Sequence, residues 1–470
     1  METKDYIPTI GLEIHAELKT KTKLFCNSRN DPDEKTPNIN ICPVCMGYPG
    51  TLPVINKEAI KHVLKIGLAL HGTLADLTEF DRKNYFYPDI PKGYQISQYK
   101  YPLVSGGALN GIDITRIHLE EDTARSTHDK SKHTLVDFNR EGIPLMELVT
   151  EPVIHTAEEA SQFARELQLL LRYLGAGDAN LEKGEMRVEA NISVSRSGEL
   201  GTKVEVKNLN SFKAVERAIA FEIKRHIEVL EEGGKITQET RGWDENTGET
   251  FSQREKESSH DYRYFPDPDL PKFKLREIPE FSEKSLRQEI PELPWDKRER
   301  LIKKFGITKE ASSLFVQDTK LGLFFEEVTR EESKEFSKLA SNYITSDIQS
   351  LLKSNSIESL PQVEYFKTII KMIQASEISS RGAKELVVLV SKENKDPKKI
   401  AEEKGLLQVS DTGSLGVIVQ KIISQNESVV NEYKSGKEAS LQYLIGQAMK
   451  EAKGSANPQL LKEIFLKNIS

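Results

Sequence analysis

The stretch GLEIHAEL, residues 11–18, places ionisable and apolar side chains at alternating positions. At the two-residue period of a β-strand, Glu13, His15 and Glu17 share one face, and the apolar residues between them share the other. Two explanations fit this pattern: the solvated face of a half-buried strand, or a cation site. Carboxylate oxygens with one imidazole are typical ligands of a hard ion such as Mg²⁺ or Mn²⁺.

Two further glutamates lie in apolar strand sequences. In TRIHLEED, residues 115–122, alternation puts Glu121 on the apolar face, and PLMELV embeds Glu147 among apolar residues. A buried carboxylate is costly unless it is paired, protonated or bound to a metal. Either acid alone is typical of a buried ion pair, but together with Glu13 and His15 they favour a cation site. The polar face of the first of these strands carries Arg116, His118, Glu120 and Asp122.

The motif CPVC, with Cys42 and Cys45, follows Cys26 and could indicate a zinc site. A structural zinc site takes four ligands, whereas these three sulfurs are one short. Ser28 stands where a second C-x-C cysteine would complete the set, and serine is a poor zinc ligand. Bound zinc is therefore doubtful, and a plain structural loop is favoured.

For nucleotide phosphates, the sequence offers neither a P-loop nor a G-x-G-x-x-G motif. Instead, VEVKNLNSF joins a strand to a helix, and such junctions present backbone N–H groups and a positive dipole end to phosphate. RVEANIS places a basic, an acidic and an amide group on one strand face, which suits nucleotide plus metal and equally suits a polar sheet surface. The candidate nucleotide-binding residues are Arg187, Glu189, Asn191, Lys207, Asn208 and Ser211.

A tyrosine-rich stretch, FDRKNYFYPDIPKGYQISQ, mixes aromatic rings with cations. Such rings can stack on nucleobases, although tyrosines in a loop at the edge of a core are the commoner explanation. HDYRYFPDPDLP has the same mixture. The candidate RNA-binding residues are Arg82, Lys83, Tyr85, Tyr87 and Arg263.

The elements that must position these residues divide the 470-residue chain into three parts. Residues 1–295 alternate short strands, turns and a few helices, including a helix that begins after a Ser211 cap. A proline-rich stretch from Pro266 to Pro294 is typical of an extended linker. The pattern predicts an all-helical domain over 296–406 and a small helical tail over 407–470. The fold class is therefore α+β, with a large sheet-based domain first.

Composition limits the class of protein. Hydrophobic residues make up 37% and charged residues 30% of the chain, and we find neither an apolar run of membrane length nor a secretory signal. Three cysteines suit a reducing cytosol, so we expect a cytoplasmic protein. The net charge of −7 does not indicate nucleic-acid binding overall, but a local basic surface would suffice. The tail, with seven lysines against six acidic residues, is a weak indication of RNA contact.

At these motifs the sequence resembles a known family. GLEIHAEL, CPVCMGYPGTLPV, FDRKNYFYPDIPKGYQISQ, HLEEDTARSTH, NREGIPLMELVTEP and KVEVKNLNSF are similar to the B subunit of the bacterial aspartyl/glutamyl-tRNA amidotransferases. The resemblance runs into the tail, at GQAMKEAKGSANPQLL. It implies a catalytic domain on a β-sheet, a helical domain and a tRNA-engaging tail. It also implies ATP, Mg²⁺, a glutaminase subunit, a small subunit that ties the other two together, and misacylated Glu-tRNA(Gln) or Asp-tRNA(Asn) as substrate.

By motif, the resemblance implies that Glu13, His15, Glu121 and Glu147 hold the metal, and that His15, Glu121 and Glu147 act in catalysis. Glu189 falls where the family has an acid near the nucleotide. Many relatives carry C-x-C before C-x-x-C and form a four-cysteine zinc knuckle, from which this chain departs. A rival hypothesis is a non-catalytic tRNA-binding scaffold, whose acids would be structural ion pairs.

Overall fold

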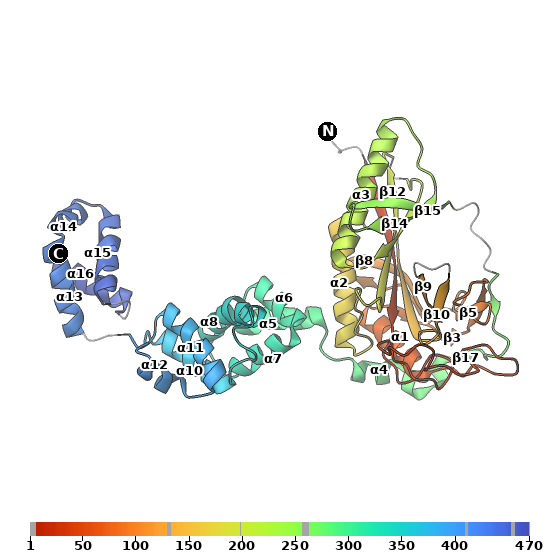
Figure 1. Cartoon of the computed structure of the whole chain (residues 1–470), viewed down its shortest axis with the longest axis horizontal. Coiled ribbons are helices and arrows are strands. Elements are labelled where there is room, and N and C mark those ends of the chain that lie inside the picture. Colours follow the sequence, from red (N-terminus) through yellow and green to blue (C-terminus); the bar gives the residue numbers. More distant parts are fainter. Residues whose placement is uncertain are drawn as a thin grey trace. The chain divides into compact units, whose positions relative to one another are not determined.

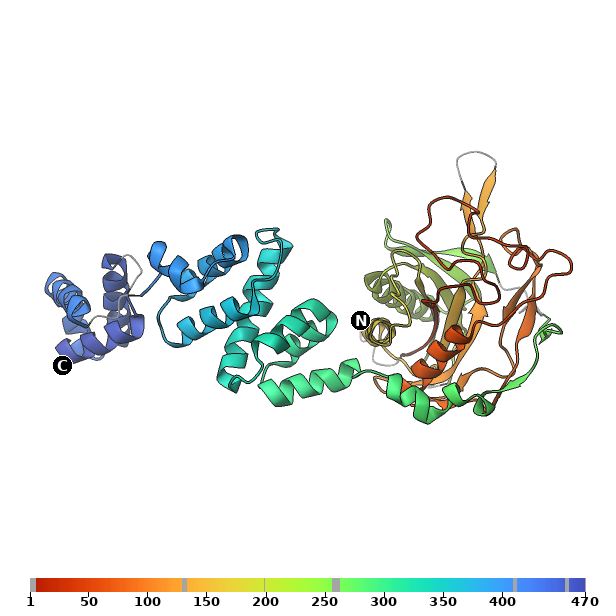
Figure 2. The same cartoon turned by 90° about the horizontal axis from the view of Figure 1, so that it is seen from below.

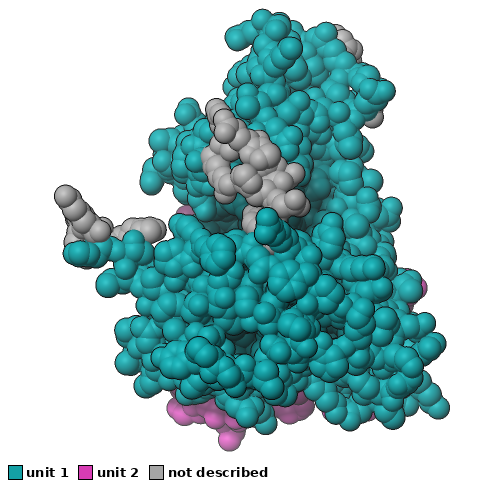
Figure 3. Space-filling model, turned by 90° about the vertical axis from the view of Figure 1, so that its right-hand side faces the viewer, with its two compact units in different colours: residues 1–294 teal, residues 295–470 magenta. Residues whose placement is uncertain are grey.

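The computed structural model describes residues 6–128, 133–197, 199–255, 263–408, 412–452 and 456–469. The chain separates into two compact units, Met1–Pro294 and Trp295–Ser470, which are coloured separately in Figure 3. The first unit contains a large sheet and the second contains helices, so the predicted α+β class is confirmed. The three-part division of the chain stays a prediction.

The first unit is built on a ten-stranded sheet in the order β15-β14-β13-β12-β1-β11-β8-β6-β2, with β7 paired to β8. Neighbouring strands are antiparallel except for the parallel pair β13 and β14. Its strands are β1 (Ile7–Glu17), β2 (Thr73–Leu74), β6 (Val104–Ser105), β7 (Ala108–Leu109), β8 (Ile112–Glu121), β11 (Pro144–Thr150), β12 (Met186–Ser195), β13 (Val204–Leu209), β14 (Glu239–Asp244) and β15 (Glu249–Glu255).

Two long helices, α2 (Ala157–Tyr173) and α3 (Phe212–Glu231), lie side by side along one face of this sheet (Figures 1 and 2). The apolar residues of β1 from Ile10 onward are buried, with Ile14 wholly inaccessible. The helices begin where their caps allow: Thr156 and Glu159 form a capping box, and Ser211 accepts a hydrogen bond from the Ala214 N–H, as predicted. The opposite face of the central strands is left for polar side chains.

Smaller elements stand beside the large sheet. A three-stranded sheet joins β16 (Phe265–Pro266), β4 (Asp81–Asn84) and β5 (Tyr94–Ser97), and β5 contacts β8. The remaining strand pairs are β3 (Leu77–Thr78) with β17 (Phe273–Lys274), and β9 (Arg125–His128) with β10 (Thr134–Asp137).

The proline-rich stretch differs from the extended linker that its composition predicts. It forms two short 3-10 helices, η1 (Leu275–Glu277) and η2 (Pro279–Phe281), and then α4 (Glu283–Glu289). Helix α4 packs on α1 (Lys57–Ala69), where Lys61 forms an ion pair with Glu289. The prediction of an extended linker was therefore wrong for residues 275–289, where Phe281 and Leu286 bury apolar surface within the first unit.

The described part of the second unit is helical. Its last helices enclose an apolar core around Leu444, Leu461 and Phe465. None of the helices in the described part of the chain has the length and apolar character of a membrane span. The helices are α5 (Pro294–Phe305), α6 (Lys309–Gln317), α7 (Thr319–Val328), α8 (Lys334–Tyr343), the π-helix η3 (Ile344–Ile348), α9 (Gln349–Lys353), α10 (Val363–Gln374), α11 (Ser380–Glu393), α12 (Pro397–Glu403), α13 (Thr412–Gln425), α14 (Glu427–Lys434), α15 (Glu438–Glu451) and α16 (Pro458–Ile469).

Candidate metal and nucleotide site

Strand register lines up three ionisable side chains across the middle of the sheet. His15 on β1 lies opposite Glu147 on β11, and Glu147 lies opposite His118 on β8. Because side chains two residues apart on a strand share a face, Glu13 and Glu120 join this face from the two outer strands. We call these five residues the carboxylate–imidazole row.

The row is closely spaced. The Nε2 atoms of His15 and His118 each lie 3.4 Å from Oε2 of Glu147. His15 Nε2 is 3.7 Å from Oε1 of Glu120 and 3.9 Å from Oε1 of Glu13. Two sets of three donor atoms, Glu13/His15/Glu147 and His118/Glu120/Glu147, each lie within 4.8 Å of one another. Oxygen and imidazole donors at such separations fit a divalent cation of the magnesium or manganese type.

Burial and charge perturb these groups strongly. Burial alone would raise the pKa of the Glu147 carboxyl, but His118 and His15 hold it well below its usual range. Burial lowers the pKa of His15, yet its hydrogen bond to Glu147 and the charge of that carboxylate raise it to about 8. Burial and the Glu147 charge raise the pKa of Glu13. Perturbations of this kind are typical of functional sites.

The structure does not bring Glu121 into the row. Its side chain takes the opposite side of β8 from Glu120, as alternation requires, and its Oε2 accepts a hydrogen bond from Lys92 Nζ at 2.7 Å. Its Oε1 accepts another from the Ile96 N–H at 2.8 Å, and Lys92 also donates to Glu141 at 3.0 Å. The expectation that Glu121 is a metal ligand is therefore corrected. This acid on the apolar face forms an ion pair with Lys92 instead.

His118 and Glu120 are the members of the row that sequence reasoning missed. The signal was present in TRIHLEED, where both fall on the polar face of the strand. H-x-E on β8 also mirrors E-x-H on β1. The sequence did not show that β1 and β8 both pair with β11, and only the fold reveals this.

Three of the predicted nucleotide-binding residues border the row. Arg187 lies opposite His15, and Glu189 lies opposite Glu13, on the neighbouring strand β12. Arg187 donates to Asp122 at 3.0 Å, and Lys207 lies 2.8 Å from Glu189.

The other three predicted nucleotide-binding residues differ in their surroundings. Asn191 lies opposite Gly11, further along β12, and its buried side-chain oxygen has no hydrogen-bond partner among the residues that the structure describes. Asn208 is exposed with a left-handed backbone (φ 64°), and Ser211 caps α3.

The predicted RNA-binding residues fall into two groups. Arg82 is held by Asp267 at 2.8 Å and by Asp269 at 2.9 Å, and its guanidinium covers the Tyr94 ring. Tyr87 and Arg263 are exposed.

Lys83 and Tyr85 lie deeper, beside the row. Burial lowers the pKa of Lys83, but the charges of Glu120 and Glu147 raise it overall. Burial also raises the pKa of Tyr85. The charge of Lys83 opposes this rise, and the charge of Glu120 adds to it. These two residues therefore lie near the row.

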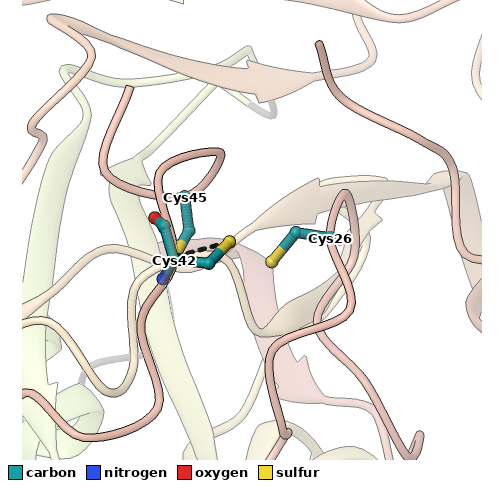
Figure 4. A group of neighbouring side chains, drawn as sticks. All are labelled: Cys26, Cys42 and Cys45. Atoms are coloured by element: carbon teal, nitrogen blue, oxygen red, sulfur yellow. Dashed lines mark hydrogen bonds between the residues drawn. The ribbon is translucent and has the colours of Figure 1, made fainter. Parts of the chain in front are cut away.

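The three cysteines do converge, and their sulfurs point toward one another in Figure 4. The sulfurs of Cys42 and Cys45 are 3.8 Å apart, and Ser28 Oγ lies 4.0 Å from the Cys45 sulfur. The buried Lys23 ammonium also lies 4.0 Å from that sulfur. Three sulfurs, a hydroxyl and an ammonium do not match a four-ligand structural zinc site, so zinc stays doubtful.

Comparison with known proteins shows the family of this chain. Residues 8–278 match the family model described as the GatB/GatE catalytic domain, and residues 323–469 match the GatB domain. The chain belongs to the GatB/GatE family. Relatives named as the B subunit of aspartyl/glutamyl-tRNA(Asn/Gln) amidotransferase include one from Caldanaerobacter subterraneus, 44% identical over 99% of each chain. Another, from Persephonella marina, is 43% identical over 98% of this chain and 99% of its own.

Apart from the first residue of β1, the catalytic-domain match contains every strand of the large sheet, and with them the whole carboxylate–imidazole row. The predicted family resemblance is therefore confirmed over both units. The names of these relatives describe one subunit of a larger amidotransferase.

Proposed function

We propose that this chain is the cytoplasmic subunit of a tRNA-dependent amidotransferase that activates the side-chain carboxylate of misacylated Glu-tRNA(Gln), Asp-tRNA(Asn) or both. An oxygen of that carboxylate attacks the γ-phosphorus of ATP, ADP leaves, and an acyl phosphate forms. Ammonia from a glutaminase subunit then attacks the carbonyl carbon, and inorganic phosphate leaves as the amide forms. The carboxylate–imidazole row, with Arg187 and Lys207 beside it, carries this proposal.

The residues of the row would hold Mg²⁺: Glu13, His15 and Glu147 as expected from the sequence, with Glu120 in place of Glu121. When bound, the cation neutralises charge that develops on the transferred phosphoryl group. Phosphoryl transfer depends mainly on positioning and charge neutralisation, so no covalent nucleophile is needed.

Arg187 and Lys207 extend the site for the polyanionic nucleotide. Asp122 orients the Arg187 guanidinium, and Glu189 orients the Lys207 ammonium, so both cations are held in place for phosphate oxygens. Together with Arg187 and Lys207, we assign three further residues to nucleotide binding: Asn191, Asn208 and Ser211. Lys83 and Tyr85, beside Glu120, would face the reacting groups.

The assembly would include the tRNA, the glutaminase subunit, and the small subunit that ties the other two together. Arg82, Lys83, Tyr85, Tyr87 and Arg263 are the residues that we assign to the acceptor end of the tRNA, and the 407–470 tail would engage the tRNA elsewhere. The exposed rings of Phe86 and Tyr87 support this assignment, because accessible aromatic rings can stack on unpaired bases.

The test is Glu147→Gln in the reconstituted complex. This substitution keeps the size of the side chain but removes the charge on which both imidazoles converge. We expect ATP-dependent amidation to be lost, with tRNA binding and glutaminase activity retained. Glu158→Gln, on the exposed side of α2, is the matched control. Unchanged amidation in Glu147→Gln would overturn the proposal and favour a non-catalytic tRNA-binding scaffold.

A further inference from the structure

The three cysteines form a cluster that the proposed function does not use. We propose that the Cys45 sulfur is a reactive thiolate that hydroperoxides oxidise, and that it then closes a disulfide with Cys42. This reaction goes beyond the proposed function, because it needs neither the nucleotide nor the carboxylate–imidazole row.

Lys23 is a buried cation in contact with this cluster. Its side chain is wholly inaccessible, and its Nζ donates to the Phe138 carbonyl oxygen at 3.2 Å. None of the ion pairs in the described part of the chain joins Lys23 to a carboxylate, whereas its ammonium lies 4.0 Å from the Cys45 sulfur. Burial lowers the pKa of Lys23, and among its charged neighbours Cys45 raises that pKa most. A buried ammonium is costly unless an anion compensates it, and an ionised Cys45 supplies that anion.

The Cys45 sulfur is also surrounded by hydrogen-bond donors. The Cys42 N–H donates to it at 3.2 Å, and the Ser28 hydroxyl lies 4.0 Å away. A hydrogen bond with Cys26 lowers the pKa of Cys45 to about 5; burial opposes this change, and the Lys23 charge adds to it. The same contact raises the pKa of Cys26, so Cys26 stays a thiol while Cys45 is ionised. A thiolate beside a lysine is the nucleophilic form of cysteine.

Two features separate this cluster from a structural zinc site. Ser28 offers a hydroxyl where a fourth thiolate is needed, and the Lys23 ammonium repels a dication bound to the Cys45 sulfur. All three cysteines are free of disulfides in the structure. The cluster is therefore available to react with an electrophile.

A cavity gives a small oxidant access to this sulfur. Its volume is about 80 Å³, and Cys26 and Cys45 both line it. A single water needs only about 10–15 Å³ of such space, so an uncharged molecule of the size of hydrogen peroxide fits. Tyr48, another lining residue, is 59% exposed, so the cavity reaches the surface.

The reaction consumes one hydroperoxide. The Cys45 sulfur attacks an oxygen of hydrogen peroxide, the O–O bond breaks, and the leaving hydroxide takes a proton from solvent. The Cys42 thiol then attacks the sulfur of the Cys45 sulfenic acid, so that an S–S bond forms, the S–O bond breaks and water leaves. The two sulfurs lie 3.8 Å apart within the CPVC turn (Figure 4), and together they lose the two electrons that reduce the peroxide. An added dithiol reverses the disulfide by exchange.

The test treats the reconstituted complex with hydrogen peroxide at neutral pH, alkylates the remaining thiols and maps this chain by mass spectrometry. We expect a disulfide between Cys42 and Cys45 that dithiothreitol removes. Cys42→Ser should instead stop at a Cys45 sulfenic acid, which dimedone labels. Lys23→Met should slow the oxidation about tenfold, because less Cys45 is ionised. Lys35→Met, at an exposed lysine, is the matched control and should react like wild type.

Because the buried Lys23→Met can fail to fold, Cys45→Ser provides a second variant, in which peroxide should leave Cys42 reduced. A tightly bound zinc ion in the wild-type complex, with cysteines that resist peroxide, would overturn the proposal. A disulfide between Cys26 and Cys42 would also overturn it, as would a folded Lys23→Met complex that is oxidised at the wild-type rate.

Discussion

Glu120 and Glu121 are neighbours in sequence whose side chains serve different parts of the molecule. Glu120 joins the carboxylate–imidazole row, whereas Glu121 pairs with Lys92 on the other side of the strand. We expect Glu120→Gln to weaken Mn²⁺ binding by at least about tenfold, or about 1.4 kcal/mol, because a charged ligand is lost. Glu121→Gln should leave Mn²⁺ binding unchanged and should lower the free energy of unfolding instead.

The size of the Glu121 effect follows from its contacts. The substitution removes a charge-assisted hydrogen bond of 2.7 Å to Lys92, worth about 1.5–3 kcal/mol. The glutamine oxygen can still accept from the Ile96 N–H, and Lys92 keeps Glu141 as a partner. We therefore expect a loss of about 2 kcal/mol in the free energy of unfolding. Lys92→Met should cost about 3 kcal/mol or more, since two buried carboxyls then lose their cation.

The assay combines urea denaturation with Mn²⁺ titration on the same four proteins: wild type, Glu120→Gln, Glu121→Gln and Lys92→Met. Unfolding curves separate lost stability from lost binding, because only a folded variant is titrated. The reasoning would be refuted by a Glu121→Gln protein that loses the ion while Glu120→Gln binds it like wild type. In that case Glu121, and not Glu120, would belong to the metal site.

Two further predictions concern other parts of the chain. Deleting residues 407–470 should weaken tRNA binding, measured by filter retention, far more than ATP hydrolysis; equal losses would mean that the tail is structural. The Glu222 carboxylate, fully buried, accepts from Arg225 and Thr250 and contacts His226. Although burial raises its pKa, hydrogen bonds from those three residues lower it to about 2. The resulting stability, about 3 kcal/mol, is complete above about pH 4.5 and lost as the pH falls toward about 2. Urea denaturation should therefore show the deficit of Glu222→Gln shrinking between about pH 5 and pH 3, and a constant deficit would contradict this.

Local periodicity in the sequence determined much of the site. Alternation on β1 separates Glu13 and His15 from the buried Ile14, and side chains in any strand must obey this separation. The start of α3 at the Ser211 cap was equally predictable, because a cap needs only residues next to it. The available donor types, carboxylate and imidazole, already limited the class of cation.

Only the tertiary structure decided which donors meet. A buried acid in an apolar strand can be paired, protonated or metal-bound. The sequence around Glu121 does not distinguish these three states. The fold brings Lys92, 29 residues away in the chain, to within 2.7 Å of that carboxylate and so makes it an ion pair. It also places β11 between β1 and β8, which unites His15, Glu147 and His118. Strand neighbours and their register depend on contacts between distant segments, and no local pattern of residues specifies them.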